Sequence, residues 1–65
     1  MKFQRAVTKD ERTTMILELL EAWEKAPNLR FGQLLENART TRTNATPMYY
    51  IEDEVLLNAV KASVA

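Results

Sequence analysis

The sequence predicts a small all-α fold: a single helical domain over residues 1–65, in which a long first helix is packed by two shorter helices. Two observations support this prediction. Apolar side chains recur at steps of three and four residues in three segments, as they do in helices that bury one face. Residues that favour helix starts or helix stops mark the ends of these segments.

The first helix is predicted over residues 8–25 (TKDERTTMILELLEAWEK). Thr8 and Glu11 have the spacing of a capping box, in which each side chain accepts a hydrogen bond from the backbone amide of the other residue. Pro27 should end the helix near Ala26, because the residue before a proline is disfavoured in the helical conformation. The expected core face consists of Met15, Ile16, Leu19, Leu20 and Trp23.

A second helix is predicted over residues 29–39, with Asn28 as its N-cap. Its apolar stripe consists of Phe31, Leu34, Leu35 and Ala38. Gly32 lies within this helix, where glycine costs up to about 1 kcal/mol relative to alanine. We therefore expect the first helix to approach closely at Gly32, beneath Trp23.

Residues 40–47 (TTRTNATP) form a predicted polar loop, and the apolar block of residues 48–51 (MYYI) follows it. Part of this block should close the core. Tyr49 and Tyr50 are adjacent and cannot easily face the same core, so we expect one of them at the surface and the other buried.

The two ends of the chain differ in their predicted structure. Residues 1–7 form an N-terminal arm, from which Phe3 or Val7 is expected to dock on the core. Residues 52–54 (EDE) favour the start of a third helix, because carboxylates stabilise the positive end of the helix dipole. Its expected apolar face consists of Val55, Leu56, Ala59 and Val60 and continues to Val64.

Composition narrows the functional classes. The chain has no cysteine and no histidine, so neither a disulfide nor a zinc site is predicted, and self-association is expected to supply stability that so short a chain lacks. Nine basic residues balance nine acidic ones, which argues against a DNA-binding role. No apolar run has the length of a membrane span or the character of a signal peptide, so we expect a cytoplasmic protein.

Two stretches, RFGQLLENA and MYYIEDEVLLNAV, resemble a family of short uncharacterised bacterial and phage helical proteins. The resemblance spans about residues 16–60. The matching residues are Trp23, Pro27, Arg30, Gly32, Gln33, Leu34, Asn37, Tyr50, Ile51, Glu52 and Asp53. The family pattern has an acidic residue shortly before the aromatic pair, whereas residues 44–48 contain none. The resemblance implies a helical fold and a phage or mobile-element origin, with the host cytoplasm as the location, and it implies no chemistry.

A non-catalytic binding protein is the leading functional interpretation. The chain has no histidine or cysteine to act as base or nucleophile, and it offers little volume for a substrate pocket. Glu18, Glu21 and Glu24 are interpreted as a solvated acidic face, and no catalytic residue, metal or cofactor is predicted. We expect a homo-oligomer that docks on a macromolecular partner. The candidate contact residues are Met48, Tyr49 and Tyr50.

The alternative is binding of a nucleotide, or of another phosphate-bearing ligand, at a subunit interface. Arginine forms bidentate hydrogen bonds with phosphate, hydroxyl groups add short donors, and a tyrosine could stack on a base. The candidate residues are Arg30, Arg39, Thr40, Thr41, Arg42 and Asn44. A helix-turn-helix is disfavoured, because the loop over residues 40–47 is longer than the turn of that motif and residues 52–54 would face phosphates.

Overall fold

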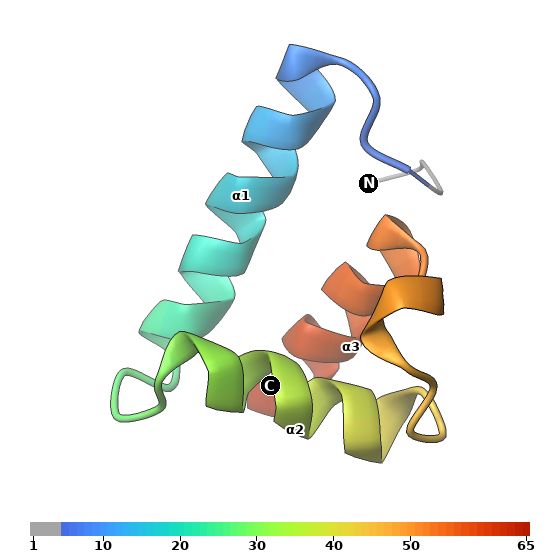
Figure 1. Cartoon of the computed structure of the whole chain (residues 1–65). Helices are drawn as coiled ribbons and strands as arrows, with labels where there is room; N and C mark the ends of the chain where they lie inside the picture. The colour runs from blue at the N-terminus through green and yellow to red at the C-terminus, as the bar shows by residue number, and fades with distance from the viewer. Residues whose placement is uncertain (1–4) are drawn as a thin grey trace.

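The computed structural model describes residues 5–65 and confirms the predicted all-α fold (Figure 1). Within these residues lie three α-helices, α1 (Lys9–Glu24), α2 (Phe31–Arg42) and α3 (Asp53–Val64), and a short 3-10 helix, η1 (Met48–Tyr50). The first helix has 16 residues and the other two have 12 each, as the predicted arrangement of one long and two shorter helices requires.

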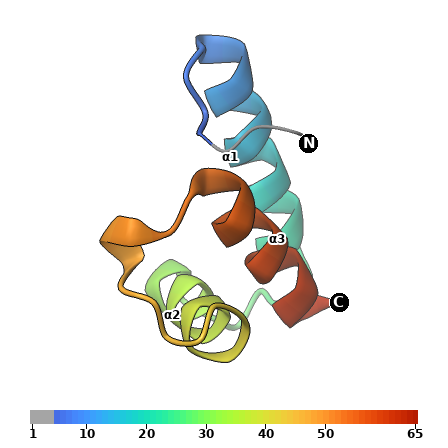
Figure 2. The same cartoon turned by 90° about the vertical axis from the view of Figure 1, so that its right-hand side faces the viewer.

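The core lies where α2 and α3 meet the C-terminal half of α1 (Figures 1 and 2). Its buried residues are Leu19 and Ala22 of α1, Leu34 and Ala38 of α2, and Leu57, Ala59 and Val60 of α3. The largest fully buried side chains are Leu34, Leu57 and Val60, all from α2 and α3. Because burial of apolar surface drives folding, the contact between α2 and α3 is the main source of stability.

The predicted core face of α1 is wrong at two of its five residues. Leu19 is buried, and Met15 and Trp23 pack partly buried against the core, but Ile16 and Leu20 are exposed. The reason is the position of the other two helices. The N-terminal half of α1 extends past α3 in both views, so α1 is covered along one side and mainly near its C-terminal end (Figures 1 and 2).

The predicted capping box at the start of α1 is confirmed. The Glu11 amide donates to Thr8 Oγ1 at 3.1 Å, and the Thr8 amide donates to Glu11 Oε1 at 3.0 Å. The same carboxylate oxygen accepts from the Val7 amide at 3.1 Å. Backbone hydrogen bonds from Thr8 and Val7 therefore lower the pKa of Glu11.

The arm before α1 contacts the rest of the described chain through Ala6, and Val7, one of the two predicted docking residues, does not dock. Ala6 is buried and its amide donates to Asp53 Oδ2 at 2.8 Å, whereas Val7 is exposed. Val7 faces away because its amide bonds to Glu11, which ties it to the cap of α1. Phe3, the other candidate, lies outside the described residues.

Helix α2 begins later than predicted, with Arg30 rather than Asn28 at its N-cap. The chain first makes a turn in which the Leu29 amide donates to the Ala26 carbonyl at 3.1 Å. Trp23 Nε1 then donates to the Leu29 carbonyl at 2.7 Å, which holds this turn against α1. The helix starts once the Arg30 amide is capped by the Gln33 side chain at 2.8 Å.

Helix α2 also ends later than predicted, at Arg42 rather than Arg39, so the first residues of the predicted loop are helical. The hydroxyl groups of Thr40 and Thr41 donate to the Glu36 and Asn37 carbonyls one turn earlier, at 3.0 and 2.5 Å. These bonds are compatible with helix and let it continue through residues that usually favour loops.

The predicted close approach at Gly32 is wrong. A Cβ added there would meet no atom within 4 Å, and Gly32 is exposed in the first turn of α2. Helix α1 instead contacts α2 through the rings of Trp23 and Phe31, whose centroids are 5.1 Å apart. Two large rings keep the helix backbones apart, so glycine is not needed for the contact.

Helix α3 begins at Asp53 with Glu52 at its N-cap, close to the predicted start. Its buried residues are Leu57, Ala59 and Val60, but the expected core residue Val55 is half exposed. Val55 lies one turn before the buried Ala59 on the same side of the helix, so its exposure follows from its position in the first turn and not from its direction around the axis.

Thr8→Ala should lower the free energy of unfolding by about 1 kcal/mol, because the Glu11 amide loses its capping oxygen. Urea denaturation followed by circular dichroism would measure the change. Thr8→Ser retains the oxygen and should stay within about 0.5 kcal/mol of the wild type. Equal losses in the two variants would show that the cap has no such role.

Glu11 should make stability depend on pH. Its folded pKa is lowered, so its contribution is complete above the unfolded pKa of about 4.3 and is lost as pH falls through the folded value. We expect the stability difference between the wild type and Glu11→Ala to narrow as denaturation is measured from about pH 6 to about pH 3. A difference that stays constant over this range would contradict the assignment.

Candidate functional site

The tyrosine turn (residues 47–50) is held in place by the backbone that leads into it. Asn44 and Ala45 adopt the left-handed conformation, with φ of 54° and 57°, and this reverses the chain after α2. Pro47 then starts η1: its carbonyl accepts from the Tyr50 amide at 2.9 Å. A proline has a fixed φ, so the entry to the turn is rigid.

Both tyrosines lie at the surface, so the prediction that one of them is buried is wrong. Tyr49 is 91% exposed and Tyr50 is 74% exposed, and their ring centroids are 5.3 Å apart in an edge-to-face arrangement. Ile51, the next residue, is partly buried. Met48, the third predicted contact residue, is also exposed, so the structure places all three on one short surface segment.

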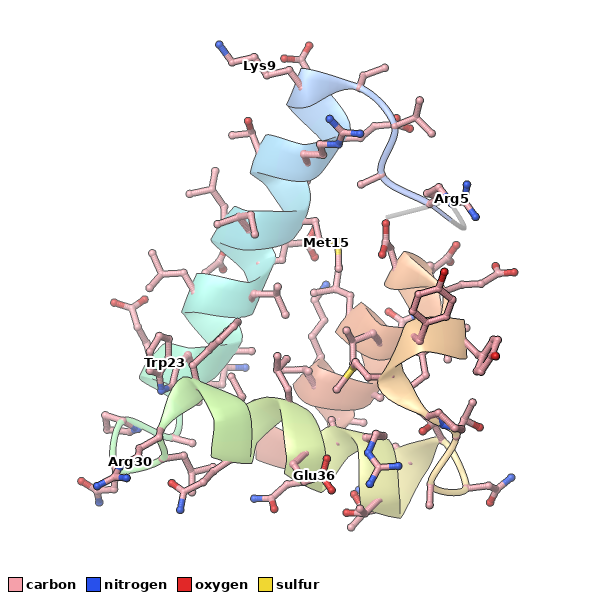
Figure 3. The ribbon with its side chains drawn as sticks, in the orientation of Figure 1. Arg5, Lys9, Met15, Trp23, Arg30 and Glu36 are labelled. Carbon is pink, nitrogen blue, oxygen red and sulfur yellow. The ribbon has the colours of Figure 1, made fainter. Side chains whose placement is uncertain are left out.

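A hollow of about 410 Å³ lies beside the two rings. Its lining consists of Arg5 and residues 49–53. Figure 3 shows Arg5 near the start of α3, where the arm returns. The bond from the Ala6 amide to the Asp53 carboxylate fixes this return, so residues far apart in the sequence build one surface. It combines exposed aromatic rings with charges of both signs.

Arg39 stabilises the segment that leads into the tyrosine turn. Its Nε and Nη2 donate to the Glu36 carboxylate at 2.8 and 2.6 Å, and its Nη1 donates to the Ala45 and Thr46 carbonyls at 2.9 and 3.4 Å. The hydrogen bond between the two side chains lowers the pKa of Glu36 and raises the pKa of Arg39. The guanidinium thus joins α2 to the strained residues that precede the tyrosine turn.

The structure does not gather the six residues of the predicted phosphate site. Arg30 and Arg42 stand at opposite ends of α2, on the order of 18 Å apart along its axis. Arg39 is occupied by Glu36 and the turn, and the hydroxyl groups of Thr40 and Thr41 bond to the backbone of their own helix. Arg42 makes one long contact, 3.5 Å from Nη2 to the Ala62 carbonyl.

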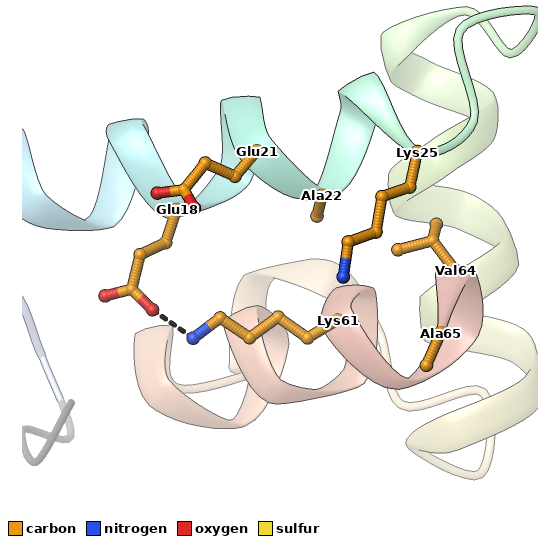
Figure 4. Close-up of a pocket in the computed structure, with 7 residues that line it drawn as sticks. All are labelled: Glu18, Glu21, Ala22, Lys25, Lys61, Val64 and Ala65. Carbon is orange, nitrogen blue, oxygen red and sulfur yellow. Dashed lines mark hydrogen bonds and ion pairs between the residues drawn. The ribbon is translucent and has the colours of Figure 1, made fainter.

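A second hollow, of about 440 Å³, lies between α1 and the C-terminal end of α3 (Figure 4). Glu18 forms an ion pair with Lys61 across it, so the interpretation of Glu18 as part of a solvated acidic face is wrong. Glu21 and Lys25 line the same hollow. Its two glutamates and two lysines favour no one sign of ligand charge.

Sequence reasoning missed two residues that matter for the tyrosine surface. Arg5 was grouped with the N-terminal arm, and no sequence signal places it beside Tyr49 and Tyr50. Arg39 was assigned to a ligand site, although its spacing from Glu36 is that of an ion pair within a helix. That spacing could have indicated a structural role.

Comparison with known proteins finds no family model, no curated protein and no solved structure that matches the chain. None of the helices in residues 5–65 combines the length and the apolar character needed to cross a lipid bilayer. Over the same residues, no group of three or more carboxylate, histidine or cysteine side chains is placed to hold a metal ion. Function is therefore inferred from the surface of the molecule itself.

Arg39→Ala should loosen the tyrosine turn, because the Ala45 and Thr46 carbonyls lose their donor and Glu36 loses its partner. We expect a lower thermal midpoint and faster amide hydrogen exchange at Ala45 and Thr46, measured by NMR. Arg39→Lys should not restore protection, since lysine lacks the planar fork. Arg42→Ala is the matched control and should leave both readings unchanged; similar effects of the Arg39 and Arg42 substitutions would overturn the assignment.

Proposed function

We propose that this chain is a non-catalytic, homo-oligomeric binding protein that docks on another protein through Tyr49 and Tyr50. The observation that carries the proposal is the exposure of both rings on a turn that the backbone and Arg39 hold rigid. Tyrosine is enriched at binding hot spots because it buries a large area at a low cost in conformational entropy.

The surroundings of the rings support docking on a protein. Met48 adjoins them and is flexible enough to adapt to a partner. Arg5, Glu52 and Asp53 line the adjacent hollow and would form the polar rim that surrounds the apolar centre of many interfaces. The rings already lie together, so little ordering would be required on binding.

Protein docking is favoured over the nucleotide alternative by the engagement of the residues that would hold phosphate. Arg39, Thr40 and Thr41 make hydrogen bonds within the chain, and a ligand would have to replace them. We also propose that the chain is not a catalyst, because the shifted carboxylate pKa values have structural causes. The lowered pKa values of Glu11 and Glu36 follow from a helix cap and an ion pair, respectively.

The resemblance to short bacterial and phage proteins suggests a biological setting. It rests on Trp23, Pro27, the segment RFGQLLEN and the segment YIED. A phage or mobile-element accessory protein that binds a host protein in the host cytoplasm is the setting that we propose.

The double variant Tyr49→Ala/Tyr50→Ala should fold as the wild type does, because neither ring is buried, but should bind its partner at least about tenfold more weakly. Immobilised wild type and variant would be compared by quantitative mass spectrometry of the proteins that each retains from host lysate. Val7→Ala truncates another exposed apolar side chain and is the control.

Retention of the same proteins by the double variant and the wild type would refute docking through the tyrosines. The nucleotide alternative is tested in the same preparation by recording the absorbance of the purified protein at 260 and 280 nm. Bound nucleotide would raise the absorbance at 260 nm relative to that at 280 nm.

A further inference from the structure

Helix α1 carries an apolar surface that nothing in the described chain covers. Ile16 is 62% exposed, Leu17 54% and Leu20 48%. Two hollows adjoin at Ile16: one of about 360 Å³ reaches Lys9 and Leu17, and one of about 270 Å³ reaches Trp23 and Phe31. Ile16, Leu17 and Leu20 stand on the side of α1 that the core does not use, so α1 is apolar on two sides.

Apolar side chains that stay in contact with water do not stabilise the fold, and a protein with so small a core has few others. Leu19 is the large side chain that α1 buries, whereas Ile16, Leu17 and Leu20 remain in contact with water. Contiguous exposed apolar side chains with charged neighbours mark interaction sites.

The order of residues along this surface indicates which molecule covers it. We define the outer face of α1 by its exposed residues Lys9, Thr13, Ile16, Leu17, Leu20 and Glu24. Their successive spacings are 4, 3, 1, 3 and 4 residues, which is the same pattern read in either direction. A positive charge stands at one end and a negative charge at the other.

A face with this symmetry is complementary to itself when the second helix runs antiparallel. Lys9 of one copy then lies opposite Glu24 of the other, Thr13 lies opposite Leu20, and Ile16 and Leu17 of both copies surround the two-fold axis. A parallel arrangement would instead oppose Lys9 to Lys9 and Glu24 to Glu24, and like charges repel.

We propose that a second copy of the chain packs on the outer face of α1, with the two α1 helices antiparallel around a two-fold axis between Ile16 and Leu17. This inference rests on the homo-oligomeric part of the proposed function and does not depend on the tyrosine turn. It places Ile16 and Leu20, which the sequence prediction assigned to the core of a single chain, at an interface between two chains.

Sedimentation equilibrium over concentrations up to about 1 mM should show a dimer. Leu17→Lys should abolish it, whereas Val55→Lys, which charges an exposed apolar residue off this face, should leave it unchanged. Lys9→Glu and Glu24→Lys should each weaken the dimer about tenfold, because each creates two pairs of like charges. The combined variant Lys9→Glu/Glu24→Lys should restore it.

Cysteine substitutions test the direction of the helices, since the chain has no cysteine of its own. When Thr13→Cys and Leu20→Cys proteins are mixed and mildly oxidised, the antiparallel dimer predicts disulfides between the two variants rather than within either one. Predominance of disulfides between identical variants would overturn the proposed packing.

The association state of the chain and its capture of a partner are measured separately. A monomer at every concentration would remove both the inference and the homo-oligomeric part of the proposal, while partner capture by Tyr49 and Tyr50 could persist. A dimer whose affinity is unchanged by every substitution on the outer face would overturn the proposed α1 packing and leave the homo-oligomeric part of the proposed function standing.

Discussion

The contact between α2 and α3 is the interaction on which the rest of the molecule depends. Leu34 of α2 and Leu57 and Val60 of α3 are fully buried, and the small residues Ala38 and Ala59 belong to the same core. Helix α1 lies against this pair along one side. A 16-residue helix that is covered on one side leaves much of its surface exposed, so the free apolar face of α1 follows directly from the small size of the core.

The tyrosine turn depends on the same contact through Arg39. Because α2 is fixed against α3, the guanidinium at its C-terminal end has a rigid base from which to hold the carbonyls of Ala45 and Thr46. Asn44 and Ala45 adopt the left-handed conformation, which is unfavourable for a side chain such as that of alanine. Hydrogen bonds to Arg39 offset that cost and keep the two exposed rings in one orientation.

The sequence was sufficient to predict the helices and the start of α1, because periodicity and capping are local properties. Thr8 and Glu11 form their capping box regardless of what packs on the helix. The sequence was insufficient for the start of α2. Asn28 is by residue type a better N-cap than Arg30, but the hydrogen bond from Trp23 to the Leu29 carbonyl holds residues 26–29 in a turn before the helix begins. Which apolar side chains are buried depends on the positions of other helices, and so Ile16, Leu20 and Val55 were wrongly expected in the core, as was one of the two tyrosines. The sequence predicted which residues would form the candidate site, Met48, Tyr49 and Tyr50. It did not predict the hollow beside them, because that hollow forms only when the arm folds back and Ala6 bonds to Asp53.

The two proposed surfaces lie on different sides of the molecule, and their arrangement has a consequence for binding. In both views η1 stands on the side of α3 that is away from α1 (Figures 1 and 2). A two-fold dimer through α1 would therefore leave both tyrosine turns uncovered, one on each flank. Two identical docking sites on one particle can engage a multivalent partner with an avidity far above the affinity of either site, provided that the spacing allows both to bind. Self-association through α1 would then serve recognition as well as stability, because a weak single contact by Tyr49 and Tyr50 would become an effective one when it is doubled.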